Sequence, residues 1–180
     1  LRELSKDIEK DLAMSLADIS NIKVNENKPI IDTLGETFEE ALELLSRVGL
    51  NDAFLFTRRY RELSEGQKYR YRLAKLIESK AQFWVMDEFC STLDRDTAKV
   101  VAFNVQKTAR KLGRAVLAAT THTDLLQDLN PSVHIHKCFG KRVEVHYYPN
   151  KPAKECSLVK EMHIEEGNHS QFKQLAPFHY

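Results

Sequence analysis

The sequence has no long apolar run, few glycines and cysteines, and almost no net charge. Among its 180 residues are six glycines and three cysteines, and its formal charge is +1. A helix that spans a bilayer needs about 20 apolar residues, so we expect that the chain does not insert into a membrane by itself. A near-neutral total gives no electrostatic reason to expect nucleic acid as a partner. The cysteines are scattered and odd in number, which favours a reducing compartment, the cytoplasm, over a disulfide framework.

The apolar residues that are present follow helix and strand periods in alternation. Helical spacing is expected in four segments: residues 1–20, residues 35–50, the stretch after Gln67, and residues 94–112. Short apolar runs at 83–86 and 115–120 predict buried strands, and 133–148 predicts a hairpin. Strand, helix and strand in this order indicate a β-α-β unit with a parallel sheet.

The predicted helices carry expectations about individual residues. In the first, the apolar face would consist of Leu4, Ile8, Leu12, Leu16 and Ile19. In the second, Thr37 would cap the N-terminus and Gly49 would end the helix, with an apolar stripe of Phe38, Leu42, Leu45 and Val48. In the last, Gly113 would end the helix after a basic final turn.

The segment Ser64-Glu65-Gly66-Gln67 has two interpretations that the sequence does not separate. S-x-x-Q is a capping box, in which Ser64 accepts a hydrogen bond from the amide of Gln67 and Gln67 reaches back. The same helix start, with a glycine beside it, would present backbone amides and the positive end of the helix dipole to an anion. A helix cap and a phosphate-binding site therefore both fit.

Polar residues follow both predicted strands. Asp87 and Glu88 come directly after the run 83–86, and His122 follows 115–120. Ligands of open parallel sheets bind beyond the carboxyl ends of the strands. There Asp87 could hold Mg²⁺ and Glu88 could polarise a water molecule. Capping or solvent-facing acids and a structural histidine are the alternative.

Taken together, four segments resemble the ATP-binding cassette (ABC) ATPases in order and spacing. "LSEGQ" is similar to the signature motif of that family, and "FWVMDE" to its Walker B segment with the following glutamate. "STLD" is similar to the D-loop and "TTH" to the switch-histidine loop. Ser64 precedes Asp87 by 23 positions, and His122 follows Asp87 by 35. The resemblance covers residues 60–145.

The resemblance implies an ATP site that two subunits share. Ser64, Gly66 and Gln67 would contact the γ-phosphate bound to the opposite subunit, and Asp94 would line the interface. The partner would be a second copy of the chain or a paired ABC domain, joined head to tail through two ATP molecules. The same resemblance implies ATP and Mg²⁺ as cofactors.

The resemblance also implies which residues act in catalysis. Asp87 would order Mg²⁺, Glu88 would be the general base, and His122 would hold the γ-phosphate and the attacking water. The implied reaction is hydrolysis of ATP to ADP and phosphate. In such phosphoryl transfer the protein mainly positions the reactants and neutralises charge.

The implied fold is α/β. It has a P-loop NTPase-like parallel sheet with flanking helices, a helical subdomain before the signature motif and a C-terminal β-hairpin. We expect residues 1–62 to be a partial helical subdomain and residues 63–149 to be a portion of the catalytic core. Residues 150–180 would be a linker and the start of a further segment or domain.

One part of the family pattern is missing. The sequence has no G-x-x-x-x-G-K-[ST] loop (Walker A) to hold the β-phosphate, and no glutamine before Gln67 that could serve as the Q-loop residue. Because the opening is like the middle of a longer sequence, we expect both to lie upstream of Leu1; the alternative is a chain that lacks them. On its own, the chain is expected to bind ATP poorly and not to hydrolyse it.

Three kinds of cassette ATPase fit these motifs. The first is a soluble ATPase that drives a fused or associated partner. The sequence from Asp87 to Pro131 most resembles prokaryotic ATPases fused to a predicted acetyltransferase domain. The second is the nucleotide-binding subunit of an ABC transporter. The third is a DNA-repair or chromosome-maintenance ATPase, although residues 1–60 show no sustained heptads. A basic cluster from Arg58 to Arg72 permits nucleic-acid contact but has no recognised aromatic pattern.

The predicted hairpin carries a weaker signal. His134, His136 and Cys138 alternate, so they could share one strand face as a metal site. With no fourth ligand visible in the sequence, a plain hairpin is the favoured interpretation.

Overall fold

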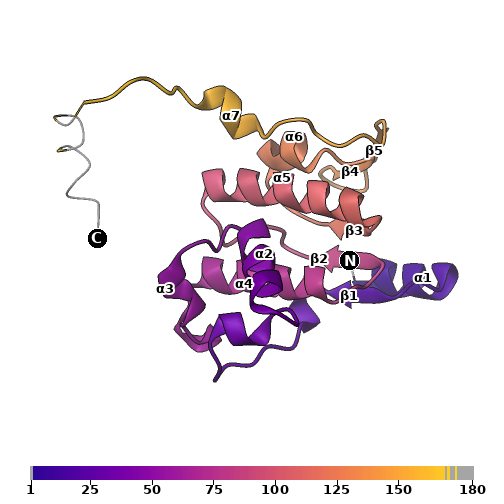
Figure 1. Ribbon diagram of the computed structural model, residues 1–180. Helices are drawn as coiled ribbons and strands as arrows, with labels where there is room; N and C mark the ends of the chain where they lie inside the picture. The colour runs from indigo at the N-terminus through magenta and orange to yellow at the C-terminus, as the bar shows by residue number, and fades with distance from the viewer. Residues whose placement is uncertain (1, 169, 171–172, 174–180) are drawn as a thin grey trace.

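The computed structural model describes residues 2–168, 170 and 173 (Figure 1). The helices are α1 (Arg2–Leu12), α2 (Phe38–Arg47), α3 (Ala53–Phe56), α4 (Glu65–Glu78), α5 (Arg95–Leu112), α6 (Leu126–Leu129) and α7 (Ser157–Glu161). The strands are β1 (Leu16–Asp18), β2 (Phe83–Met86), β3 (Ala115–Ala118), β4 (Val133–Lys137) and β5 (Val143–Tyr147). Short 3₁₀ helices are η1 (Ile19–Asn21), η2 (Ile30–Thr33), η3 (Tyr60–Glu62) and η4 (Thr123–Leu125).

Three parallel strands form the central sheet. Their order is β1-β2-β3, and Trp84 of β2 lies opposite Ala17 of β1 and Val116 of β3. In the chain, α4 lies between β1 and β2, and α5 lies between β2 and β3. The expected parallel sheet with flanking helices is therefore confirmed. Strands β4 and β5 pair antiparallel, which confirms the predicted hairpin.

One face of this sheet carries the main hydrophobic core. Trp84 and Met86 are fully buried and belong to one cluster with apolar residues of α4 and α5. Right-handed β-α-β connections place both helices on this face, and Figure 1 shows α5 above and α4 below the level of β2. Phe83 and Val85 alternate to the other face; they are also buried but lie outside that cluster.

Strand β1 lies where the sequence analysis expected the end of the first helix. That expectation was wrong for Leu16 and Ile19, because α1 ends at Leu12 and Ala13 takes a left-handed φ of 49°. Leu16 then pairs with Phe83 of β2. Helical apolar spacing continues across the break, and a strand this short has no period of its own that could reveal it.

The predicted helix ends agree with the structure at two positions. Thr37 caps α2 by accepting a hydrogen bond from the amide of Glu40 at 3.2 Å, and Gly113 follows α5 with a φ of 63°. Phe38 was wrongly placed in the apolar stripe of α2. It is the first residue of the helix and its side chain is 62% exposed, whereas the buried residues of α2 are Ala41, Leu44 and Leu45.

Strand β3 is less buried than expected. All four of its residues are partly exposed. Among the described strands it pairs only with β2, so its other edge is unpaired. Its apolar sequence predicted the strand correctly but not its position at the edge of the sheet.

The stretch after Pro149 contains a docked helix. Both the amide and the hydroxyl of Ser157 donate to the carboxylate of the fully buried Asp128, each at 2.6 Å. Lys99 of α5 donates to Glu161 at 2.9 Å. These bonds hold α7 against α5 and α6, and residues 162–168 run away from the rest of the fold (Figure 1). None of the described helices is both long enough and apolar enough to cross a membrane.

We expect Asp128→Ala to release α7 and to lower the free energy of unfolding by about 1–3 kcal/mol, because the buried donors of Ser157 would lose their acceptor. Urea unfolding measures the change, and hydrogen exchange at residues 157–161 locates it. Asp32→Ala is the matched control, since Asp32 is exposed and its carboxylate accepts no hydrogen bond from the described residues. Equal stability of the two variants would contradict the anchoring role of Asp128.

Candidate functional site

The carboxyl ends of β2 and β3 meet at one edge of the sheet, and three predicted site residues follow them. Asp87 and Glu88 come directly after β2, and both side chains are exposed. The amide of Ala119 donates to the carbonyl of Met86 at 2.9 Å and joins the two strand ends. His122 follows β3 and is half-buried. The structure thus places both carboxylates and the imidazole at the edge where the sequence analysis expected them.

The turn after β2 has an unusual backbone. Glu88 and Cys90 have positive φ angles of 49° and 59°, in a region that residues other than glycine rarely adopt. Hydrogen bonds from the Ser91 amide to the Glu88 carbonyl (3.0 Å) and from the Leu93 amide to the Cys90 carbonyl (3.2 Å) hold the turn. Such conformations cost about 1–3 kcal/mol each and gather at functional sites. The backbone therefore supports a functional role for this turn.

Ser64 caps α4 as the S-x-x-Q pattern predicts. Its hydroxyl accepts a hydrogen bond from the Gln67 amide at 3.3 Å, and Gln67 Oε1 accepts one from the Ser64 amide at 3.0 Å. These bonds use acceptor oxygens and leave the Ser64 O–H and the Gln67 NH₂ group as donors. Helix α4 has 14 residues, so its N-terminus carries a positive dipole end. The cap and an anion site are therefore compatible.

The start of α4 packs against the D-loop segment (Ser91–Asp94). A Cβ atom added to Gly66 would lie 3.2 Å from Leu93 Cδ2 and 3.4 Å from the Thr92 carbonyl oxygen, so glycine permits this close approach. One turn further along, the Tyr69 hydroxyl accepts a hydrogen bond from the Cys90 amide at 3.2 Å. The signature segment and the D-loop segment are therefore parts of one packed unit.

Asp94 ends the D-loop segment and caps α5. Its Oδ1 accepts a hydrogen bond from the Thr97 amide at 2.9 Å. Hydrogen bonds from Thr97 hold the pKa of Asp94 below its ordinary value. The side chain is exposed. Asp94 therefore caps α5, and its role at a subunit interface stays a prediction.

The sequence analysis missed an ion pair that joins two of the motifs. Arg95 Nε, in the first turn of α5, donates to Asp124 Oδ2 at 3.0 Å. Asp124 lies in η4, directly after the switch-histidine segment, and the hydrogen bond from Arg95 lowers its pKa. The only sign of this pair in the sequence was the opposite charges of the two residues. A local sequence pattern does not predict contact between residues that are 29 positions apart.

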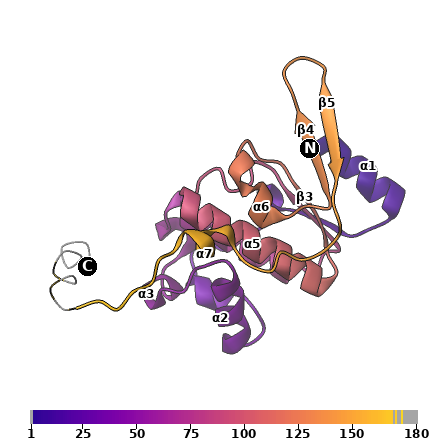
Figure 2. The same cartoon turned by 90° about the horizontal axis from the view of Figure 1, so that it is seen from above.

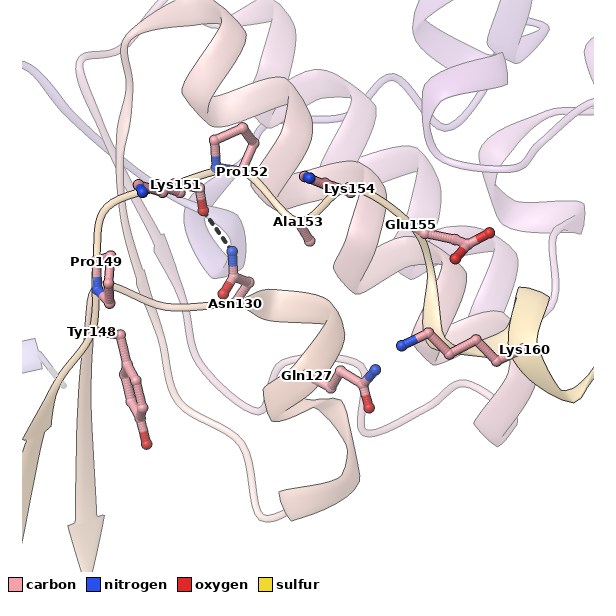
Figure 3. Close-up of a pocket in the computed structure, with 10 residues that line it drawn as sticks. All are labelled: Gln127, Asn130, Tyr148, Pro149, Lys151, Pro152, Ala153, Lys154, Glu155 and Lys160. Carbon is pink, nitrogen blue, oxygen red and sulfur yellow. Dashed lines mark hydrogen bonds between the residues drawn. The ribbon is translucent and has the colours of Figure 1, made fainter.

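A hollow on the described surface lies away from these residues. It has a volume of about 540 Å³ and lies between α6, the segment 148–155 and Lys160 (Figure 3). At its rim, Asn130 Nδ2 donates to the Lys151 carbonyl at 2.6 Å. None of the predicted site residues lines this hollow, so it is not the candidate site.

A comparison with protein families finds a match that includes part of these motifs. A family model described as "ABC transporter" matches residues 5–91, which include the signature segment, Asp87 and Glu88. Over these residues, just under half of its length, the chain is similar to the ATP-binding cassette family. The match includes two of the four motifs, the signature segment and the Walker B segment.

Curated relatives of this chain include import ATP-binding proteins. The methionine import ATP-binding protein MetN 2 of Pseudomonas entomophila (strain L48) is 29% identical over 140 residues, covering 74% of this chain and 41% of that protein. The phosphonates import ATP-binding protein PhnC of Hyphomonas neptunium (strain ATCC 15444) is 31% identical over 101 residues, covering 56% and 36%. This chain thus spans about two fifths of the length of these relatives.

A solved structure confirms the fold. A dimeric ATP-binding cassette bound to ADP and Pi, in a post-hydrolysis state, matches with a TM-score of 0.55 at 15% identity, covering 68% of this chain and 59% of that one. At this identity the likeness concerns the fold alone. The α/β fold of an ABC ATPase, predicted from the motifs, is correct.

We expect Tyr69→Phe to destabilise the chain more than Tyr71→Phe does. Loss of the Tyr69 hydroxyl leaves the buried Cys90 amide without its acceptor, which costs about 1–3 kcal/mol. The Tyr71 hydroxyl bonds Thr33 at 2.6 Å, but Thr33 also donates to the Ile30 carbonyl, so this loss is about 1 kcal/mol. Urea unfolding compares the two variants. Equal effects would argue against Tyr69 as the link between α4 and the D-loop segment.

Proposed function

We propose that this chain supplies part of the ATP site of an ABC-type ATPase, which binds and hydrolyses ATP as a head-to-tail dimer and drives a fused or associated partner. The sheet edge carries the proposal: the exposed Asp87 and Glu88 follow a fully buried strand, and His122 follows the neighbouring strand. Phosphoryl transfer needs positioning and charge neutralisation more than covalent chemistry from the protein. Two carboxylates and an imidazole held by a buried sheet suit that task.

Each of these three residues has a proposed part in hydrolysis. Glu88 would take a proton from the attacking water, and His122 would donate a hydrogen bond to the γ-phosphate. Asp87 fits Mg²⁺, because an exposed carboxylate at a strand end offers the oxygen donor that this ion prefers. Bound Mg²⁺ would neutralise phosphate charge.

Ser64, Gly66 and Gln67 are proposed to act on the nucleotide of the partner subunit. The free donors of Ser64 and Gln67, together with the backbone amides at the start of α4, suit an anion. Since Gly66 lies against Leu93, movement of the D-loop segment would displace these donors. In this dimer Asp94 would lie at the subunit interface, between the two ATP sites.

A transporter subunit is the second candidate, and the relatives favour it. Two of them are named as import ATP-binding proteins, for methionine and for phosphonates. A membrane importer is therefore one proposed partner, with the cytoplasm as the compartment of this domain. The free cysteines Cys90, Cys138 and Cys156 are consistent with that compartment. The relatives reported above give no support to a fused acetyltransferase or to DNA repair, which stay predictions from the sequence.

Residues 1–180 alone are expected to show no ATP turnover, because no glycine-rich phosphate loop lies among them. A phosphate-release assay on this chain, with the full-length protein measured in parallel, checks the expectation. Equal turnover by both would contradict the view that the β-phosphate is held by residues outside this chain.

In the full-length protein, Glu88→Gln is expected to slow hydrolysis by about 100-fold or more, because the general base is lost, and to accumulate as an ATP-bound dimer. Size-exclusion chromatography with ATP and a turnover assay measure the two effects. Glu36→Gln is the control, since it removes an exposed carboxylate outside the sheet edge. A Glu88→Gln protein that stays monomeric with ATP and turns over normally would refute the role of Glu88.

A further inference from the structure

One face of the β4–β5 hairpin collects side chains of the kinds that bind transition metals. Antiparallel pairing places His134 opposite His146 and His136 opposite Glu144. Side chains alternate along a strand, so these four residues share one face. Cys138 lies two positions after His136 and adds a thiol to the same face. Three imidazoles, a carboxylate and a thiol therefore gather on a two-stranded element.

Three of these side chains already lie near coordinating distance. His136, Cys138 and Glu144 each have a donor atom within 4.8 Å of the donor atoms of the other two. His146 Nε2 is 3.8 Å from Glu144 Oε2. A tetrahedral zinc ion with bonds of about 2.0–2.3 Å holds its ligand atoms about 3.5 Å apart. Small side-chain rotations would thus let these three side chains share one ion, with His146 beside Glu144 at its edge.

The surrounding bonds orient these groups as a second shell does in metal sites. Arg142 Nη2 lies 2.6 Å from Glu144 Oε1, while the other oxygen of Glu144 is the one that lies near His146. The Cys138 amide donates to the Arg142 carbonyl at 3.1 Å, which extends the pairing beyond the strands and keeps Cys138 beside β5. The ring of His134 stacks at 6.0 Å from the rings of both His136 and His146.

The apolar side chains of the hairpin contribute little buried surface to its stability. It projects from the rest of the fold (Figure 2), and its apolar face is about half exposed at each of the residues Val133, Ile135, Val143 and Val145. An isolated two-stranded hairpin is marginally stable in water. A metal ion bound by residues of β4, the turn and β5 would add binding free energy to the folded hairpin.

We propose that His136, Cys138 and Glu144 bind one zinc-class divalent cation, with water in the fourth position, and that this ion fastens the hairpin. A thiolate and an imidazole select Zn²⁺ or a similar transition-metal ion over Mg²⁺. The site is therefore chemically distinct from the Mg²⁺ position proposed at Asp87, and its failure or success leaves the ATPase proposal untouched. The sequence analysis favoured a plain hairpin because it found no fourth ligand, and strand pairing adds Glu144 to His136 and Cys138.

Titration of the reduced chain with Co²⁺ tests this site directly. We expect saturation at one ion per chain, with the sulfur-to-cobalt charge-transfer absorption of a thiolate ligand, and displacement of Co²⁺ by Zn²⁺. Cys138→Ser should abolish the charge-transfer band. Because even outer-shell changes cost about 10–100-fold in metal affinity, loss of a ligand in His136→Ala should weaken Zn²⁺ binding by about 100-fold.

His163→Ala is the matched control for these variants. His163 Nε2 lies 3.6 Å from Glu165 Oε2, so this residue is also an exposed histidine beside a glutamate, but it lies outside the hairpin. It should leave Zn²⁺ affinity unchanged. Equal weakening by His163→Ala and His136→Ala, or a charge-transfer band that survives Cys138→Ser, would overturn the proposal.

A second measurement on the unsubstituted chain avoids any folding defect of the variants. Cys138 is partly exposed, whereas Cys90 and Cys156 are buried, so a thiol reagent should react first with Cys138. Equimolar Zn²⁺ should slow that reaction by at least about tenfold, since a coordinated thiolate is protected, and EDTA should restore it. An unchanged rate with Zn²⁺ would mean a hairpin without a metal and would contradict the proposal.

Discussion

Strand β2 is buried on both faces, and its pairing with β1 and β3 holds the sheet together. A strand of this kind requires a paired strand at each edge and cover on each face. Trp84 and Met86 meet that requirement on one side through α4 and α5, and Phe83 and Val85 are buried on the other. The chain leaves the core directly after Met86. The position of the exposed carboxylates that follow is therefore set by the packing of four apolar residues.

The packing of α4 on the D-loop segment gives the candidate site its second part. Gly66 lies against Leu93, and the Tyr69 hydroxyl bonds the Cys90 amide. In the proposed dimer, the start of α4 serves one ATP and the turn after β2 serves the other. Since both belong to one packed unit, a change at either ATP would be transmitted through a few direct contacts. The Arg95–Asp124 pair extends this unit to the switch-histidine segment.

The hairpin and α7 attach to this core by different means. Helix α7 is anchored by a buried carboxylate, Asp128, which accepts two hydrogen bonds from Ser157. The hairpin has an apolar face that the described residues leave half exposed. The proposed metal site would stabilise the hairpin from its polar face, independently of nucleotide. Polar groups thus attach α7 and, in the proposal, stabilise the hairpin, whereas apolar burial stabilises the central sheet.

Local patterns were sufficient for much of the prediction. The Ser64 cap, the buried strand before Asp87 and the hairpin each depend on residues a few positions apart, so the sequence by itself determined them. The order of the motifs carried the resemblance to the ABC ATPases. Strand β1, the edge position of β3, the Arg95–Asp124 pair and the anchoring of α7 depend on partners that are distant in the chain. Only the tertiary structure decided these, because a short strand or a lone charge has no local signal for the partner that it meets after folding. The same reason kept Glu144 and His146 apart from His136 and Cys138 until strand pairing brought them together.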